Sequence, residues 1–289
     1  MNKIDANPPL VVITDPGEDL DDTFALLLAA TSEKFFFAGV ISTNEDLTPE
    51  GVGRVACYAR VLLNAMGREK VPVFQGESHG KHPFLCHEDL ENLTPQNHDY
   101  LSFVKDLSQT HEKVYLLGIG AMTPLAQIAN AKWFDSKCFS IFQMGGSLQR
   151  SEYNLKGDIE SARIVLTKGN KVCWITSDTT FQQEMQVHPS SAVYKKIDEL
   201  PQRLAKLMKN NFFRFRQAYE RLGYFPYLSD AVAFSALETD AVTFVEKKVK
   251  LLDDGQIREG LQGTSTLISQ SVNIQTFMSY LFDRMDHLE

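Results

Sequence analysis

Short apolar runs recur along the chain, and most are followed by a stretch in which apolar positions have helical spacing. The runs that predict buried strands are Leu10–Thr14, Phe35–Ser42, Lys113–Leu117, Cys138–Met144 and Lys171–Thr176. The stretches that predict helices are Thr23–Ala30, Gly51–Met66, Pro124–Asn130 and about residues 200–221. Apolar strands that alternate with helices form βαβ units, so the pattern predicts a mostly parallel central sheet flanked by helices, an open α/β fold. With no Gly/Ser linker or repeat, we expect one domain over residues 1–289.

Charge and cysteine content narrow the function classes. The net charge is −8 without a Lys/Arg-rich block, which argues against nucleic-acid binding, because neutralising phosphates needs a basic surface. No apolar run approaches the roughly 20 residues of a membrane span, and the first ten residues lack the apolar core of a signal peptide. The four cysteines are scattered, with no C-x-x-C pair. We therefore expect a cytoplasmic protein without a disulfide framework or a zinc site.

The richest chemistry follows the first predicted strand. Thr14–Asp22 reads T-D-P-G-E-D-L-D-D and packs five carboxylates into the loop before a helix. Capping of the helix N-terminus explains one or two acids, whereas five in close quarters repel one another and need a cation. Oxygen ligands without Cys or His favour Ca²⁺ or Mg²⁺, and a dense shell of carboxylates and carbonyls favours Ca²⁺. Ligands of open parallel sheets bind beyond the carboxyl ends of the strands, where this loop lies.

The same segment resembles a family signature. D-P-G-x-x-x-D-D-T-F-A-L-L-L-A is similar to the D-x-D-P-G-x-D-D-x-x-A-L of the nucleoside hydrolases, with two residues inserted after Gly17 and Thr14 in place of an acid. Asp15 matches the first aspartate, and Asp21 and Asp22 match the pair, although the insertion leaves open a role for Asp19.

Further segments match in the family's order along almost the whole chain. They are I-S-T-N ending at Asn44, V-P-V-F-Q-G ending at Gly76, G-I-G-A-M-T-P-L-A around Thr123, M-G-G from Met144, E-Y-N from Glu152 to Asn154, and L-S-D-A-V-A around Asp230. Taken singly, Asn44 fits a turn and Thr123 or Asp230 fits a helix cap. Their shared order at strand ends is what favours a functional site.

The resemblance implies an enzyme that cleaves the N-glycosidic bond of a ribonucleoside with a calcium-bound water and releases base and ribose. It places Asp15, Asp22, Asp230 and the Thr123 carbonyl around one Ca²⁺, with Asp15 also as the catalytic base. It assigns ribose binding to Asp21, Asn44, Met144, Glu152 and Asn154. The expected partner is a small nucleoside or ribosyl ligand, and homo-oligomer formation and base preference stay open.

Two departures from the family pattern bear on the substrate. Ser229 stands where many purine-accepting members have the His that protonates the leaving base. Replacements for this acid are Tyr219, Tyr224 and Tyr227 on the nearby aromatic stretch, or His79, His82 and His87 in a loop. The loop from Gly146 to Glu152 is also short, which leaves the 5′ side of the sugar more open or contacted by Arg150.

These departures keep a second hypothesis open. It is a catalytically weak or inactive homologue that binds a 5′-substituted riboside or ADP-ribose. The retained aspartates argue for a working enzyme, because an inactive site has no need of a full metal shell. A phosphatase of the haloacid dehalogenase type would require D-x-D-x-T/V after the first strand, and D-P-G-E-D does not supply it.

Overall fold

One mixed sheet organises the computed structural model, which describes residues 7–77, 83–90, 93–169 and 171–288. Its strands are β1 Pro9–Thr14, β2 Phe36–Ser42, β3 Val73–Phe74, β4 Val114–Gly118, β5 Phe139–Met144, β6 Cys173–Ile175, β7 Val242–Leu251, β8 Ile257–Glu259 and β9 Thr264–Val272. Its α-helices are α1 Asp21–Ala30, α2 Arg54–Ala65, α3 Tyr100–Thr110, α4 Thr123–Asn130, α5 Tyr153–Gly157, α6 Ile159–Lys168, α7 Ser177–Thr180, α8 Ala192–Lys196, α9 Gln202–Ala218, α10 Ser229–Glu238 and α11 Ile274–Asp286. The prediction of an α/β fold with a mostly parallel sheet is confirmed.

The strand order places a ligand-binding crevice near the middle of the sheet. The order is β3-β2-β1-β4-β5-β6-β9-β7-β8, and every pair from β3 to β9 is parallel. From β1 the chain proceeds to β2 and β3 on one side, and then returns to β4, β5 and β6 on the other. The direction in which successive strands are added to the sheet therefore reverses between β1 and β4. Connections leave the carboxyl ends of these two strands toward opposite sides, which opens a crevice there.

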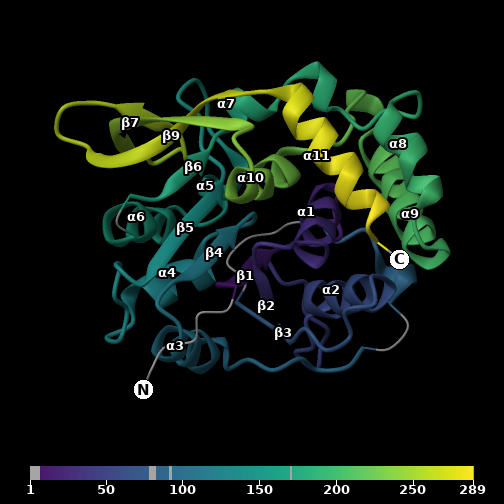
Figure 1. Ribbon diagram of the computed structural model, residues 1–289, viewed down its shortest axis with the longest axis horizontal. Helices are drawn as coiled ribbons and strands as arrows, with labels where there is room; N and C mark the ends of the chain where they lie inside the picture. The colour runs from purple at the N-terminus through teal and green to yellow at the C-terminus, as the bar shows by residue number, and fades with distance from the viewer. Residues whose placement is uncertain (1–6, 78–82, 91–92, 170, 289) are drawn as a thin grey trace.

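Alternate residues of β1 enter two different apolar cores. Leu10 and Val12 belong to the core beneath α1, α2, α10 and α11, whereas Val11 and Ile13 belong to the core beneath α3, α4 and α6. Figure 1 shows these two helix layers on opposite sides of the sheet. All four side chains are at most 1% exposed. Burial on both faces explains why β1 reads as an uninterrupted apolar run.

The region after residue 240 was not predicted as strand. There β7 pairs antiparallel with β8 and with β9, and β9 joins β6 in parallel. Figure 1 shows β7 and β9 extending together away from the helices around α1 and α2.

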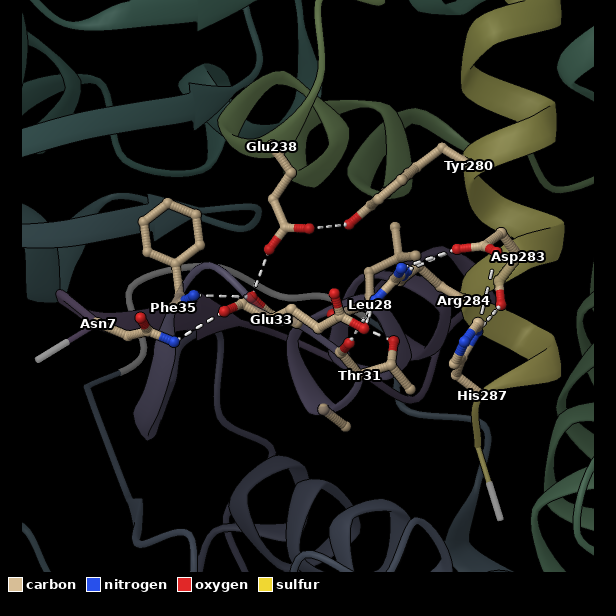
Figure 2. Close-up of polar contacts among 12 residues, drawn as sticks. Asn7, Leu28, Thr31, Glu33, Phe35, Glu238, Tyr280, Asp283, Arg284 and His287 are labelled. Carbon is tan, nitrogen blue, oxygen red and sulfur yellow. Dashed lines mark hydrogen bonds and ion pairs between the residues drawn. The ribbon is translucent and has the colours of Figure 1, made fainter.

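A polar network attaches the C-terminal helix α11 to the body. The Tyr280 hydroxyl donates to Glu238 Oε2 at 2.7 Å, and Glu238 also accepts from Ser32 at the end of the α1 turn. Arg284 donates to the Thr31 carbonyl at 3.1 Å and pairs with Glu33. Figure 2 shows α10, α11 and the segment after α1 meeting at these side chains. The network therefore connects α1 and α10, the two helices whose N-termini reach the crevice.

Among the residues that the structure describes, no helix is long and apolar enough to span a membrane. Cytoplasmic localisation and the single-domain organisation stay predictions.

Candidate active site

A cavity of about 580 Å³ opens in the crevice where β1 and β4 end. This volume is in the range of pockets that bind small ligands. The cavity is lined by residues from both halves of the sheet: Asp15, Glu18, Asp19, Asp21, Asp22, Ile119, Met144, Arg150, Glu152, Tyr153, Asn154, Phe181, Gln186, Phe215, Tyr219, Gly223, Tyr224, Phe225, Pro226, Tyr227, Ser229 and Asp230. It has a buried polar end and an exposed aromatic end, since its acidic and amide side chains are mostly buried while Tyr153 and Tyr224 are about half exposed.

Two helix N-termini bring the aspartates together at the buried end. Asp21 begins α1, and its two carboxylate oxygens accept the N–H groups of Ser229 and Asp230 at 2.9 and 3.0 Å, where α10 begins. Asp22 Oδ1 accepts from the Asp15 N–H at 3.1 Å and from the Thr14 hydroxyl. Asp21 therefore caps α10, and Asp22 ties α1 to the end of β1.

These buried carboxyls are electrostatically unfavourable as a group. Burial raises the pKa of Asp21, Asp22 and Asp230 well above the ordinary range, and neighbouring carboxylates raise it further. Burial likewise raises the pKa of Asp19 to about 7, with Glu18 and Asp15 adding to the effect. A cation among them would reverse this, because it favours their charged form.

The chemistry of the donor atoms at the buried end fits a metal ion. Oxygen donors from carboxylates, without Cys or His, suit a hard divalent cation. Nevertheless, within the described ranges no three or more His, Cys, Asp or Glu side chains stand close enough to share one metal ion. One reason is visible in the hydrogen bonds, because both oxygens of Asp21 and one of Asp22 are already used by the protein.

Asn44 and Gly120 determine the position of the Asp15 carboxylate. The Asn44 amide donates to Asp15 Oδ2 at 2.5 Å. Asn44 is 2% exposed, has a left-handed φ of 50°, and its Oδ1 has no hydrogen-bond partner among the described residues. Gly120 follows β4, and a Cβ there would lie 2.3 Å from Asp15 Oδ1. Only glycine leaves the room in which the Asp15 carboxylate now lies.

Glu152 and Asn154 belong to the short α5 region beside the cavity. Glu152 Oε2 accepts the N–H groups of Gly146 at 2.9 Å and Leu155 at 3.2 Å, so it caps α5 and closes the loop after β5. The Asn154 amide donates to the Ile119 and Met144 carbonyls, each at 3.2 Å. These bonds fix both side chains at the ends of β4 and β5, where they line the cavity together with Met144.

Aromatic rings form the exposed end of the cavity. Phe181 and Tyr227 stack with centroids 4.7 Å apart, and the Arg150 guanidinium lies 4.9 Å from the Phe181 ring. On the other wall, Phe215 and Tyr219 are 4.7 Å apart, and Tyr224 follows at 6.3 Å from Tyr219. Apolar rings beside fixed polar groups are typical of sites for planar organic ligands.

The structure separates the predicted site residues into two sets. Asp15, Asp21, Asp22, Met144, Glu152, Asn154 and Asp230 line the cavity, and Asn44 contacts Asp15. Thr123 does not line it. Thr123 begins α4, and its hydroxyl donates to Asp158 at 2.6 Å.

Only some of the candidate proton donors line the cavity. Tyr219, Tyr224 and Tyr227 line the cavity, whereas His87 does not, and lies 4.0 Å from Asp46. His79 and His82 lie outside the described residues. Ser229 is 2% exposed and lines the cavity, and its hydroxyl has no hydrogen-bond partner in the part of the chain that the structure describes.

Sequence reasoning missed several cavity residues, mainly Glu18, Tyr153, Phe181, Gln186, Phe215 and Phe225. The sequence carried a signal for one wall of the cavity, because Phe215 on α9 and Tyr219, the residue that follows α9, are four residues apart, the spacing of one helix face. Phe181 follows the short α7, and its sequence context carries no comparable pattern.

The model of the family described as inosine-uridine preferring nucleoside hydrolase matches residues 10–279. Among curated proteins, the chain is similar to the pyrimidine-specific ribonucleoside hydrolase RihA of Photobacterium profundum. That relative is 27% identical over 225 residues, which cover 69% of this chain and 70% of the relative. RihA of Escherichia coli is 24% identical, over 96% of this chain and 98% of its own.

Solved structures show the same fold. A purine-preferring ribonucleoside hydrolase from Gardnerella vaginalis superposes with a TM-score of 0.79 at 18% identity, covering 97% of this chain and 98% of the other. A plant nucleoside hydrolase superposes with a TM-score of 0.77 at 19% identity, covering 97% and 99%.

Proposed function

The chain belongs to the inosine-uridine preferring nucleoside hydrolase family and is therefore a nucleosidase, and we propose that it uses Ca²⁺ and the residues around Asp15 to hydrolyse the N-glycosidic bond of ribonucleosides. The observation that carries the proposal is the position of Asp15. It follows β1 at the crevice between β1 and β4, lines the cavity and is oriented by Asn44 at 2.5 Å. An oriented carboxylate at this point of an open sheet is suited to act on a bound small molecule.

We assign the metal to the buried end. Asp15, Asp22 and Asp230 would hold Ca²⁺ with side-chain oxygens, and the Thr123 carbonyl is proposed as a fourth ligand from the family pattern alone. When bound, calcium supplies a positive charge that orients water and the ribose hydroxyls and relieves the repulsion among the carboxyls. The raised pKa values of Asp22 and Asp230 support this assignment, since a nearby cation stabilises the charged form of a buried carboxyl.

The ribose would lie between the aspartates and α5. Asp21, Asn44, Glu152, Asn154 and the Met144 wall are fixed by hydrogen bonds or buried packing, so they need little rearrangement to receive the sugar. Cleavage gives the sugar oxocarbenium character, and carboxylates near the ring stabilise that developing positive charge.

Asp15 is proposed as the general base. Its carboxylate accepts a proton from the water that attacks the anomeric carbon, while Asn44 holds Oδ2 and leaves Oδ1 facing Gly120. The hydrogen bond from the Asn44 amide to Oδ2 keeps the Asp15 carboxylate in one orientation, which favours proton transfer along one direction.

The alternative of a weak homologue that binds ADP-ribose has less support in the cavity. Seven carboxyl side chains line the cavity, and Arg150 is the one cationic side chain among the described lining residues. A diphosphate would meet mostly like charge there. Arg150, at the aromatic end, is the one described lining side chain that could bind a 5′-phosphate, so 5′-substituted ribosides are included in the test.

The decisive experiment is base release from uridine, inosine and p-nitrophenyl riboside, with calcium and after treatment with a calcium chelator. We expect the enzyme to turn over with calcium and to lose activity after chelator treatment. Adding calcium back should restore the activity. Elemental analysis of protein purified without chelator should find one calcium per chain. ADP-ribose binding by calorimetry without any base release would instead identify a binding protein.

A further inference from the structure

The cavity lacks an efficient donor of a proton to a leaving base. Among its described lining residues there is no His, Lys or Cys. Burial raises the pKa of Tyr153 and Tyr219, and the Glu18 carboxylate beside them raises it further. Tyr224 and Tyr227 also line the cavity, but a hydroxyl group is a much weaker acid than an imidazolium. The remaining acids are carboxyls, of which the proposed function uses all but Glu18 and Asp19, and a cation bound in the aspartate cluster would favour the charged form of Asp19 as well.

A neutral base needs that proton, because it leaves with an electron pair on a ring nitrogen. A base that already carries a positive charge does not, since the same electron pair neutralises it. The electrostatics of the cavity favour the second kind of base. The lining carboxyls outnumber Arg150 seven to one, and one bound divalent cation leaves them in excess.

The aromatic end offers a specific place for such a charge. The Glu18 carboxylate accepts the hydroxyl of Tyr219, at the end of α9, and is hydrogen-bonded to Tyr153, at the start of α5. The Glu18 carboxylate thus contacts the hydroxyls of two tyrosines that come from different elements. A cationic ring that lies against a tyrosine face gains cation–π attraction, and a nearby carboxylate adds a charge interaction.

Two further observations point to a ligand in this cavity, one at its buried end and one at its aromatic end. The buried Ser229 hydroxyl lines the cavity and has no partner within the described residues, although a buried hydroxyl normally has one. Aromatic rings at the exposed end already attract cations of the protein itself. Arg150 lies over Phe181 at 4.9 Å and Arg216 lies over Phe225 at 3.8 Å.

We propose that the site is selective for ribosides whose base carries a permanent positive charge, such as 7-alkylated purines, with Glu18, Tyr153 and Tyr219 recognising the charged ring. This inference rests on the proposed function for its hydrolytic step. Water forms the new C–O bond at the anomeric carbon, and its proton passes to Asp15. The C–N bond breaks, and its electron pair stays on the ring nitrogen, so the base leaves neutral. The products are ribose, the neutral base and one proton.

The test compares 7-methylguanosine with guanosine, a pair that differs by one methyl group and one charge, at a pH slightly below neutral. The neutral p-nitrophenyl riboside is included because its leaving group is activated without being cationic. We expect a KM for 7-methylguanosine at least about tenfold below that of either neutral substrate, equivalent to about 1.4 kcal/mol. This KM should rise with added NaCl, because salt screens charge interactions, while the guanosine KM stays constant.

Variants locate the effect. Glu18→Gln should reduce the kcat/KM ratio of 7-methylguanosine to guanosine by about tenfold, and Tyr219→Leu should reduce it as well. Glu112→Gln is the matched control, because Glu112 is exposed and does not line the cavity. Calorimetry with 7-methylguanosine and guanosine provides a binding readout that does not depend on turnover.

The outcomes distinguish the two proposals. Equal KM and binding for both guanosines, with p-nitrophenyl riboside cleaved, would overturn the charge selectivity and leave the hydrolase intact. No cleavage of any riboside, with tighter binding of 7-methylguanosine, would overturn the proposed hydrolysis and support the charged-ring site. An unchanged substrate ratio in both Glu18→Gln and Tyr219→Leu would refute the assignment of these residues.

Discussion

Replacing Gly120 by alanine tests whether the position of Asp15 controls activity. The added Cβ would lie 2.3 Å from Asp15 Oδ1, 2.7 Å from its Cγ and 2.7 Å from Thr43 Cγ2. Real Cβ atoms essentially never approach other atoms within 3.0 Å. The carboxylate is the most mobile of these neighbours, since it ends a side chain, whereas Thr43 is fully buried. We therefore expect the Asp15 carboxylate to move and its bond to Asn44 to stretch or turn.

The size of the effect follows from the displacement. Restoring an ordinary contact requires a movement of about 1 Å, and a misplacement of about 1 Å at a reacting group costs on the order of 10²-fold in rate. This corresponds to about 2.7 kcal/mol of transition-state stabilisation. Stability should change much less, because alanine lowers the entropy of the unfolded chain by an amount worth about 0.4–1 kcal/mol, which offsets part of the crowding.

The assay is kcat/KM for p-nitrophenyl riboside, measured beside thermal unfolding. Gly120→Ala should lose about 10²-fold in kcat/KM while its Tm falls by no more than about 5 °C. Gly260→Ala is the matched control, because nothing lies within 4 Å of its added Cβ and its backbone does not have a left-handed φ. Activity of Gly120→Ala within about threefold of the parent, against the expected 10²-fold loss, would show that Asp15 is not positioned by this contact or is not the base.

Three other predictions concern single side chains. Asp15→Asn should leave the unfolding transition intact and lower kcat by at least roughly 10²-fold, as the loss of a general base does, and activity close to the parent's would place the base elsewhere. Burial raises the pKa of Glu45 from its ordinary 4.5 to about 7, so the folded chain binds this proton more tightly than the unfolded chain does. The free energy of unfolding should then fall as pH rises from about 4.5 to 7, by up to about 3 kcal/mol. Urea denaturation of Glu45→Gln should show a smaller fall, whereas parallel pH curves would contradict the assignment. Tyr280→Phe removes the 2.7 Å bond to Glu238 and should cost about 1–2 kcal/mol of stability in urea denaturation without changing KM; a change below about 0.3 kcal/mol would mean that water replaces it.

The sequence predicted the central strands well because both of their faces are buried. β1, β2, β4, β5 and β6 all lie within the predicted runs, apart from shifts of one or two residues at their ends. The strands β7 and β9 escaped prediction because one face of each is exposed. Val242–Leu251 alternates Lys, Glu and Thr with apolar residues and is only partly buried. Its pairing depends on β9, more than ten residues further along the chain, and such a tertiary context is not visible in a local pattern.

The residues of the candidate site likewise fall into those that the sequence could locate and those that it could not. Residues that follow strands, such as Asp15, Asn44 and Glu152, could be located because strand ends in a parallel sheet share one edge. Phe181 and Gln186 could not, since their place in the cavity follows from the path of the chain after α7 rather than from a repeating pattern. Thr123 is a third case, because the family order suggested its carbonyl as a ligand, whereas the contact that the structure shows is between its side chain and Asp158. The carbonyl assignment therefore stays a prediction.

The two ends of the sheet also bear on how copies of this chain can meet. The outermost strands are β3, with two residues, and β8, with three. β3 is further covered by the segment around Asn97, whose carbonyl accepts the Gln75 N–H at 2.8 Å. The short and covered β3 border gives an incoming strand almost no free backbone groups to join, whereas at the other border β8 pairs only with Val249–Leu251 of β7. Growth of a continuous sheet from one copy to the next is therefore disfavoured at the β3 border, and a strand from a second molecule would have to pair along the part of β7 that β8 leaves uncovered.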